Sequence, residues 1–116
     1  MRDEIIVQKI NSTTAVWPTA TIAQADGHKF KNSGVTFVIL QNISTTTARN
    51  VTFPTPNKVF GLDIADMTVS IPANSYRVIG PFSVQAYNYY TETEYGMMHI
   101  DTVSPYTDIL IRVFKF

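Results

Sequence analysis

The sequence contains no cysteine, only three leucines, and no long run of hydrophobic residues or of charge of one sign. Without cysteine the chain can form neither disulfides nor thiolate metal sites, and cysteine usage leaves the cellular compartment open. Nine basic and nine acidic residues give no net charge, so the chain lacks the positive surface that a nucleic-acid backbone requires. No apolar segment approaches the roughly 20 residues of a membrane-spanning helix. We therefore expect neither nucleic acid nor a membrane as a partner.

The first residues are unlike a secretion signal. Met1 to Glu4 carry acidic residues where a signal peptide is basic, and Ile5 to Ile10 is too short and too polar to be its apolar centre. The sequence therefore predicts a soluble protein made in a cytoplasm. Two interpretations of residues 1–14 stay open: a docking arm, or the first strand of a domain that spans residues 15–116.

Residues branched at Cβ dominate the composition. Val, Ile and Thr make up about a third of the chain, and such side chains fit a pleated strand better than a helix. Short alternating segments recur roughly every 8 to 14 residues with turn signals between them. This spacing predicts an all-β, single-domain fold, namely an antiparallel β-sandwich or a small β-barrel of about eight strands.

Several segments can be assigned individually. Val35 to Leu40 and Ile109 to Phe114 are apolar on both faces, which predicts central strands covered from two sides. Val69 to Phe82 alternates on either side of a Pro-Ala-Asn-Ser turn, which predicts a β-hairpin whose prolines end the strand pairing. Val84 to Tyr90 and Glu94 to Ile100 are expected to form two further strands.

The residue types that catalysis or metal binding needs are few and scattered. His28 lies beside a turn and is expected at the surface, whereas His99 is expected within a strand, and neither lies in a metal-binding motif. No nucleophile elbow or phosphate-binding loop is present. The acidic residues follow no ligand pattern and are expected to be solvated: Asp26, Asp63, Asp66, Glu92, Glu94, Asp101 and Asp108.

These observations predict a protein that is not an enzyme and that has no cofactor, no metal and no small-molecule substrate. A hydrolase remains a further hypothesis, because two carboxylates far apart in the sequence can meet in the fold.

A cluster of tyrosines follows the Gly-Pro-Phe sequence. Strand alternation would place Tyr87 and Tyr89 on one face and Tyr90 on the other. Either one face packs into the core, or the rings form an exposed patch suited to a protein interface or to sugar stacking. The complete set of candidate interface residues includes apolar residues near the N-terminus: Ile5, Ile6, Val7, Trp17, Tyr87, Tyr89, Tyr90 and Tyr95.

Three segments occur in a recognisable order. They are ADGHKFKNSGVTFVILQN at 25–42, DIADMTVSIPANSYRVIGPFSVQAYN at 63–88, and the C-terminal VSPYTDILIRVFKF. Their common elements are an Asp-Gly turn, a Thr-Phe strand that ends in Asn42, a Val-Ser-Ile-Pro-Ala turn, a Gly-Pro-Phe corner and Asn88. This order resembles that of small β-rich proteins which tailed bacteriophages and prophages encode near their head genes. The resemblance covers about residues 25–116.

The resemblance implies a virion structural protein, in particular a decoration or cement protein that binds the major capsid protein on the outside of a phage head. It supplies no catalytic residues. It implies synthesis in the host cytoplasm and a final place on the capsid surface. The local three-fold sites of a capsid favour a homo-oligomer such as a trimer. The alternatives are a carbohydrate-binding or receptor-binding module that uses Trp17 and the tyrosines, and a neck or tail component.

Overall fold

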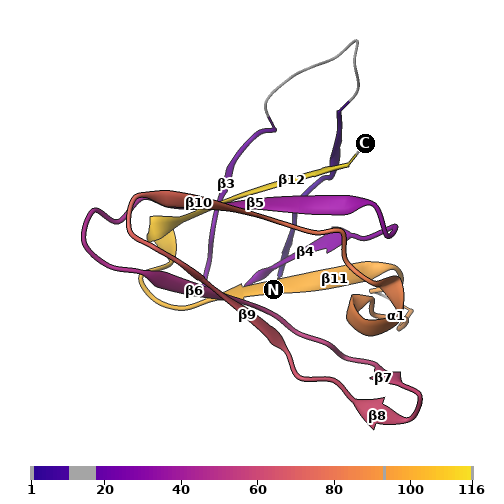
Figure 1. Cartoon of the computed structure of the whole chain (residues 1–116). Helices are drawn as coiled ribbons and strands as arrows, with labels where there is room; N and C mark the ends of the chain where they lie inside the picture. Colours follow the sequence, from indigo (N-terminus) through magenta and orange to yellow (C-terminus); the bar gives the residue numbers. More distant parts are fainter. Residues whose placement is uncertain (1, 11–17, 93, 116) are drawn as a thin grey trace.

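The computed structural model describes residues 2–10, 18–92 and 94–115, and shows two β-sheets packed face to face (Figure 1). We name each sheet after one of its central strands. The β11 sheet contains, in spatial order, β1 (Asp3–Glu4), β4 (His28–Lys31), β11 (Met97–Thr102), β6 (Arg49–Phe53) and β9 (Met67–Ile71). The β5 sheet contains β10 (Ser75–Ile79), β5 (Thr36–Asn42), β12 (Ile109–Lys115) and β2 (Gln8–Lys9), with β3 (Thr21–Ile22) also paired to β12. The predicted β-sandwich is therefore confirmed.

Three short elements lie outside these two sheets. β7 (Lys58–Val59) and β8 (Leu62–Asp63) form a hairpin that projects from one end of the sandwich, on the side of helix α1 (Val84–Tyr87) (Figure 1). A single 3₁₀ turn, Tyr106–Asp108, precedes β12. No helix among the described residues is long and apolar enough to cross a membrane.

The strand pairs are mostly antiparallel, as predicted, but each of the two sheets also contains one parallel pair and is therefore mixed. β1 runs parallel to β4, and β2 runs parallel to β12. Both parallel pairs arise because the N-terminal segment crosses from the edge of one sheet to the edge of the other, and alternation alone does not determine strand direction. The described part of residues 1–14 thus belongs to the sandwich, and Ile5 lies in its core.

The two segments predicted to be central strands are central. β5 lies between β10 and β12, and β12 lies between β5 and β2. On the side that faces the β11 sheet, Val38 and Leu40 of β5 and Ile111 of β12 are completely buried. β5 starts at Thr36, so Val35 lies just outside the strand and is half exposed.

The hairpin predicted at Val69 to Phe82 is wrong, because this segment connects the two sheets. β9 pairs with β6 in the β11 sheet, whereas β10 pairs with β5 in the β5 sheet. The buried Asn42 holds the connection: its amide donates hydrogen bonds to the carbonyls of Ile71 (3.0 Å) and Thr47 (2.9 Å). A hairpin and an inter-sheet connection share the same alternation around a short turn, so the pattern does not separate them.

The strand predicted over Val84 to Tyr90 is wrong for its first half, which forms one turn of helix α1. Ser83 caps this turn, because its hydroxyl oxygen accepts a hydrogen bond from the backbone N–H of Ala86 (3.4 Å). The next strand, β11, begins at Met97 rather than at Glu94. Several of the twelve strands in the described residues are only two residues long, which accounts for the difference from the eight expected.

Ile5 and Ile6 are adjacent but have opposite environments, which gives a matched test of the N-terminal segment. Ile5 is 6% exposed, whereas Ile6 is 77% exposed. Ile5→Ala should lower the free energy of unfolding by about 2–5 kcal/mol, because burial is lost and a cavity remains. Ile6→Ala should change it by no more than about 0.5 kcal/mol. Urea titrations of both variants measure the difference, and equal effects would contradict the placement of Ile5 in the core.

Candidate protein interface

A pair of buried asparagines organises the end of the sandwich that carries α1. The Asn32 amide donates to Oδ1 of Asn88 (2.7 Å), and the Asn88 amide donates to the backbone carbonyl of Asn32 (2.8 Å). Asn32 also donates to the carbonyl of Phe82 (3.3 Å), just before α1. Asn57, which precedes the β7–β8 hairpin, donates to the carbonyl of Asn88. The turn after β4, the segment around α1 and the hairpin are therefore held together.

Phe82 fills the interior beneath this end. Its ring centroid lies 5.1 Å from that of Phe53, 6.2 Å from that of Phe30 and 5.6 Å from that of Tyr87. Tyr87 is partly buried against the core, and its hydroxyl lies 3.8 Å from the sulfur of Met67. Tyr87 therefore stabilises the interior and has little surface left for a partner.

Tyr90 and Tyr95 lie at the surface of the same end. They are 49% and 71% exposed, and their rings meet edge to face with centroids 5.4 Å apart. The Tyr90 hydroxyl donates to the carbonyl of Val84 (2.9 Å), which ties the pair to α1. The prediction that Tyr87 and Tyr89 share a face is wrong, because Tyr87 turns inward from α1 whereas Tyr89 lies over β11.

Tyr89 covers a buried titratable group. Its ring stacks on the imidazole of His99 with centroids 3.9 Å apart. Nε2 of His99 lies 3.3 Å from Oε2 of Glu94, and the Lys29 ammonium donates to Oε1 of the same carboxylate (3.4 Å). Burial lowers the pKa of His99 and raises the pKa of Tyr89. Burial opposes ionisation of Glu94, but the hydrogen bonds from His99 and Lys29 outweigh it and lower the pKa of this carboxyl.

His28 is also buried, so its predicted surface position is wrong. It is 1% exposed, because β4 begins at this residue and β1 pairs alongside it. Within the described chain neither of its ring nitrogens has a hydrogen-bond partner, and Oδ2 of Asp3 lies 3.8 Å from Nδ1. Burial lowers the pKa of His28.

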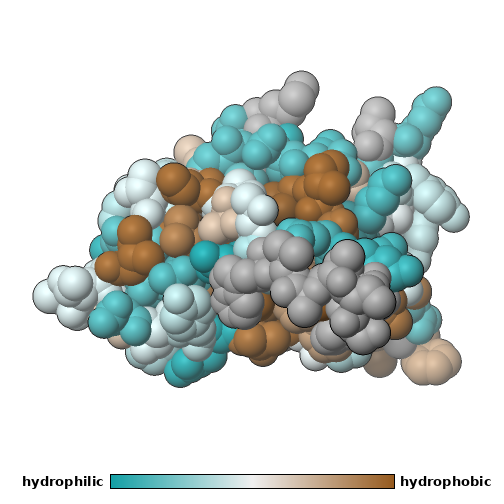
Figure 2. Space-filling model, turned by 90° about the horizontal axis from the view of Figure 1, so that it is seen from above, coloured by the Kyte–Doolittle hydropathy of each residue, from teal (hydrophilic) through white to brown (hydrophobic). Residues whose placement is uncertain are grey.

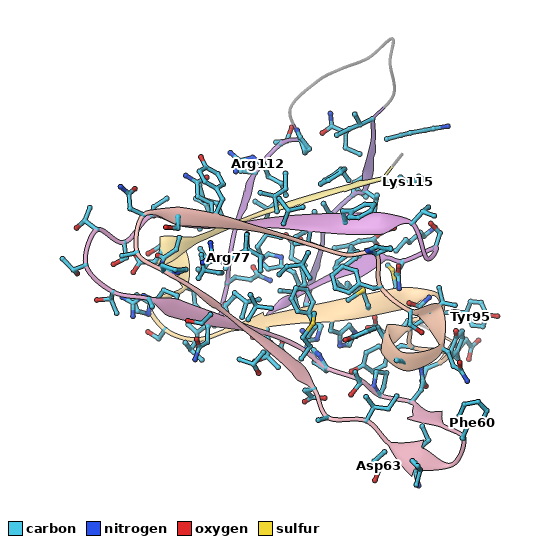
Figure 3. The ribbon with its side chains drawn as sticks, in the orientation of Figure 1. Phe60, Asp63, Arg77, Tyr95, Arg112 and Lys115 are labelled. Carbon is cyan, nitrogen blue, oxygen red and sulfur yellow. The ribbon has the colours of Figure 1, made fainter. Side chains whose placement is uncertain are left out.

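The β7–β8 hairpin presents an aromatic residue that the sequence analysis missed. Phe60 is 95% exposed and points away from the sandwich (Figure 3), and Leu62 is 71% exposed. Phe60 and Gly61 form the turn with φ values of 53° and 77°, a conformation for which Asn-Gly is the preferred sequence. Lys58 and Asp63 form an exposed ion pair across the hairpin at 3.8 Å. The Phe-Gly dipeptide between two aliphatic residues was the available signal.

A cleft of about 480 Å³ opens beside the N-terminal segment. Ile5, Ile6 and Val7 form an apolar wall, and Tyr95 also lines the cleft. The groups with shifted pKa values, such as His99, are not among its lining residues. Its charged lining residues are Glu4, Lys31 and Lys115.

The outer faces of the two sheets differ in polarity. Side chains next to core-facing ones in a strand point outward, and on the β11 sheet these are mostly polar. They include Glu4, Lys29, Lys31, Asn50, Thr52, Thr68, Ser70 and Asp101. This face has the composition expected of a sheet whose outer side largely meets solvent. The exception is His99 of β11, which Tyr89 covers.

The outer face of the β5 sheet carries more apolar side chains than that of the β11 sheet. Its middle is formed by side chains of β5 and β12, which include Ile39. Two polar side chains also lie there, where the Arg112 guanidinium donates to Oε1 of Gln41 (3.0 Å). At the sides of this face, Tyr76 and Val78 of β10 are 51% and 63% exposed, and Ile22 of β3 is 58% exposed. Figure 2 views the molecule from this side and shows hydrophobic side chains in separate groups, with hydrophilic side chains between them.

The structure separates the candidate residues near the N-terminus. Ile5 lies in the core and Val7 packs partly against it, whereas Ile6 is exposed beside the cleft. Trp17 lies outside the described residues. Among the sequence candidates that the structure describes, Ile6, Tyr90 and Tyr95 are therefore the ones open to a partner.

Several of the described charged side chains form ion pairs with each other. Across the described ranges, no group of three or more His, Asp or Glu side chains is placed to hold a metal ion. Asp108 binds the guanidinium of Arg49 at 2.8 Å, and Asp101 pairs with Arg2.

A scan against protein-family models found no match, and searches of curated proteins and of solved structures also found none. The geometry and the sequence resemblance therefore carry the functional argument.

Stability should decline in mildly acidic solution, because two buried imidazoles stay neutral in the folded chain. Burial lowers the pKa of His28 and His99 below the value of about 6.5 that they have in an unfolded chain, although Asp3 and Glu94 act against this shift. As the pH falls, these histidines are protonated in the unfolded chain before they are protonated in the folded chain. The free energy of unfolding is therefore at its full value above about pH 6.5 and decreases progressively below it. Thermal melts across this range should show a falling Tm, and His99→Gln should reduce the fall. A Tm independent of pH would contradict this.

Proposed function

We propose that this chain is a non-enzymatic structural protein of a bacteriophage virion, which decorates the outer capsid surface by binding the major capsid protein. The observation that carries the proposal is the exposure of apolar side chains on the outer face of the β5 sheet, where Ile22, Tyr76 and Val78 are each more than half exposed. They lie on either side of Arg112 and Gln41. The outer face of a two-sheet sandwich is ordinarily polar, as it is on the β11 sheet. Exposed apolar residues gathered on one face are typical of an interaction surface.

The capsid as partner comes from the resemblance to small phage proteins encoded near head genes. A chain without net charge suits a position outside the packaged nucleic acid, because it has no strong attraction to phosphate. A capsid repeats the same site many times, so neighbouring contacts can add through effective concentration and each copy can bind modestly. A rigid sandwich serves this role because little conformational entropy is lost when it binds.

Replacement of one exposed residue tests the surface. Val78→Lys should abolish co-sedimentation with capsids of the parent phage assembled without this protein, because a charge would be buried in an apolar contact. Val103→Lys is the matched control, since Val103 is 57% exposed but lies in the loop between β11 and β12. Equal binding by both variants, or no binding by the unaltered chain, would refute the proposal.

A second candidate function is carbohydrate or receptor binding by the exposed Tyr90–Tyr95 pair. Aromatic rings of this kind provide contact area at a low entropy cost. Their edge-to-face arrangement gives no flat platform for two successive sugars. Isothermal titration calorimetry against host surface glycans separates the two functions. A heat of glycan binding that is absent for the Tyr90→Ala variant but present for the Val78→Lys variant would favour carbohydrate binding.

A further inference from the structure

Phe60 is placed where it does not contribute to the stability of its own chain. Its side chain is 95% exposed, so it gains almost nothing from burial. Its φ of 53° is a conformation that asparagine and glycine adopt more easily than an aromatic residue does. An exposed aromatic side chain on a turn held in an uncommon conformation points to a contact outside the chain.

The hairpin that carries Phe60 is nevertheless held firmly. The Thr55 hydroxyl donates to the carbonyl of Ile64 (2.6 Å), and the backbone N–H of Thr55 donates to the Asp66 carboxylate (2.9 Å). Asn57 ties the same segment to the buried Asn88. The hairpin that carries Phe60 is therefore held in one conformation, and a partner can bind Phe60 with little loss of conformational entropy in the hairpin.

The same chain contains an apolar recess of suitable size. The cleft beside the N-terminal segment has a volume of about 480 Å³, and Ile5, Ile6, Val7 and Tyr95 supply its apolar lining. Tyr95 is 71% exposed, and Ile6 is 77% exposed. An aromatic ring that entered the cleft would cover both residues.

The hairpin and the cleft lie at the same end of the sandwich but beside different edge strands of the β11 sheet. The hairpin belongs to the connection between β6 and β9, and β9 is one edge strand. The cleft lies beside β1, which is the other edge strand. Because the two surfaces are separate, the hairpin of one copy can enter the cleft of another, and such contacts close into rings when the rotation permits.

The charges at the two surfaces are complementary. Asp63, at the base of the hairpin, has a side chain that is 88% exposed. Lys31 and Lys115 line the cleft, and no carboxylate in the described part of the chain forms an ion pair with either of them. A hairpin that entered the cleft would bring Asp63 toward these two cations, while Lys58 would approach Glu4.

We propose that the occupant of the cleft is a second copy of this chain, which inserts Phe60 of its β7–β8 hairpin against Ile6 and Tyr95. Figure 3 shows Phe60, Asp63, Tyr95 and Lys115 on the same side of the molecule. The inference goes beyond the proposed function and does not depend on it, because the contact concerns copies of the chain free in solution.

Sedimentation velocity of the whole chain, from micromolar to millimolar concentration, tests the contact. The unaltered chain should show a mass that rises with concentration, and Phe60→Asn should weaken this association about 30-fold or more. Phe60→Asn should keep or raise Tm, because asparagine suits the turn. Val103→Asn, at an exposed position in another loop, should associate like the unaltered chain. A monomer at all concentrations, or unchanged association of Phe60→Asn, would overturn the proposal.

A mixing experiment tests the pairing of hairpin with cleft. Ile6→Asp should also prevent association, because it places a charge in the apolar wall of the cleft. A mixture of Phe60→Asn and Ile6→Asp should form a heterodimer, since the first variant keeps its cleft and the second keeps its hairpin. Absence of the heterodimer would show that hairpins do not bind clefts. Capsid binding is measured separately through Val78→Lys, so failure of one proposal leaves the other intact.

Discussion

The reciprocal hydrogen bonds between Asn32 and Asn88 are the interaction on which the end of the sandwich with α1 and the β7–β8 hairpin depends. Both side chains are almost completely buried, and buried amides that lose a partner pay the full cost of desolvation. Their bonds join the turn after β4 to the segment after α1, and Asn57 adds the β7–β8 hairpin to the same network. The segments that carry the Tyr90–Tyr95 pair and Phe60 are therefore held in place by buried hydrogen bonds.

This framework divides the surface into regions with different uses. The outer face of the β11 sheet is mostly polar, whereas the outer face of the β5 sheet exposes more apolar side chains and is the proposed capsid surface. The hairpin and α1 lie at one end of the sandwich, away from either face (Figure 1). A copy bound to a capsid through the β5 sheet would keep this end free for a neighbouring copy. Contacts between neighbouring copies and contacts with the capsid would then strengthen each other on a repeating lattice.

Much of the fold was predictable because its signals are local. The apolar residues on both faces of Val35 to Leu40 and of Ile109 to Phe114 predicted the central strands. The misinterpreted segments share one feature, which is that distant residues decided their structure. Asn42 turns the connection between β9 and β10 into a link between sheets, and packing of Tyr87 against Phe82 accompanies a helical turn where a strand was expected. The exposure of Phe60 could not be predicted either, because the neighbouring sequence does not indicate whether other parts of the chain pack against this side chain.

The β-rich class, the lack of disulfides and thiolate sites, and the two central strands could all be read from the amino-acid sequence. These features follow from composition and from side-chain periodicity, which act over a few residues. The pairing of the strands, the burial of His28 and the exposure of particular tyrosines became clear in the folded chain. Those outcomes depend on contacts between residues far apart in the chain, such as Asp3 with His28 and Asn32 with Asn88. Local preference does not specify such contacts, because a strand pairs equally well with any neighbour that completes its hydrogen bonds and covers its apolar face.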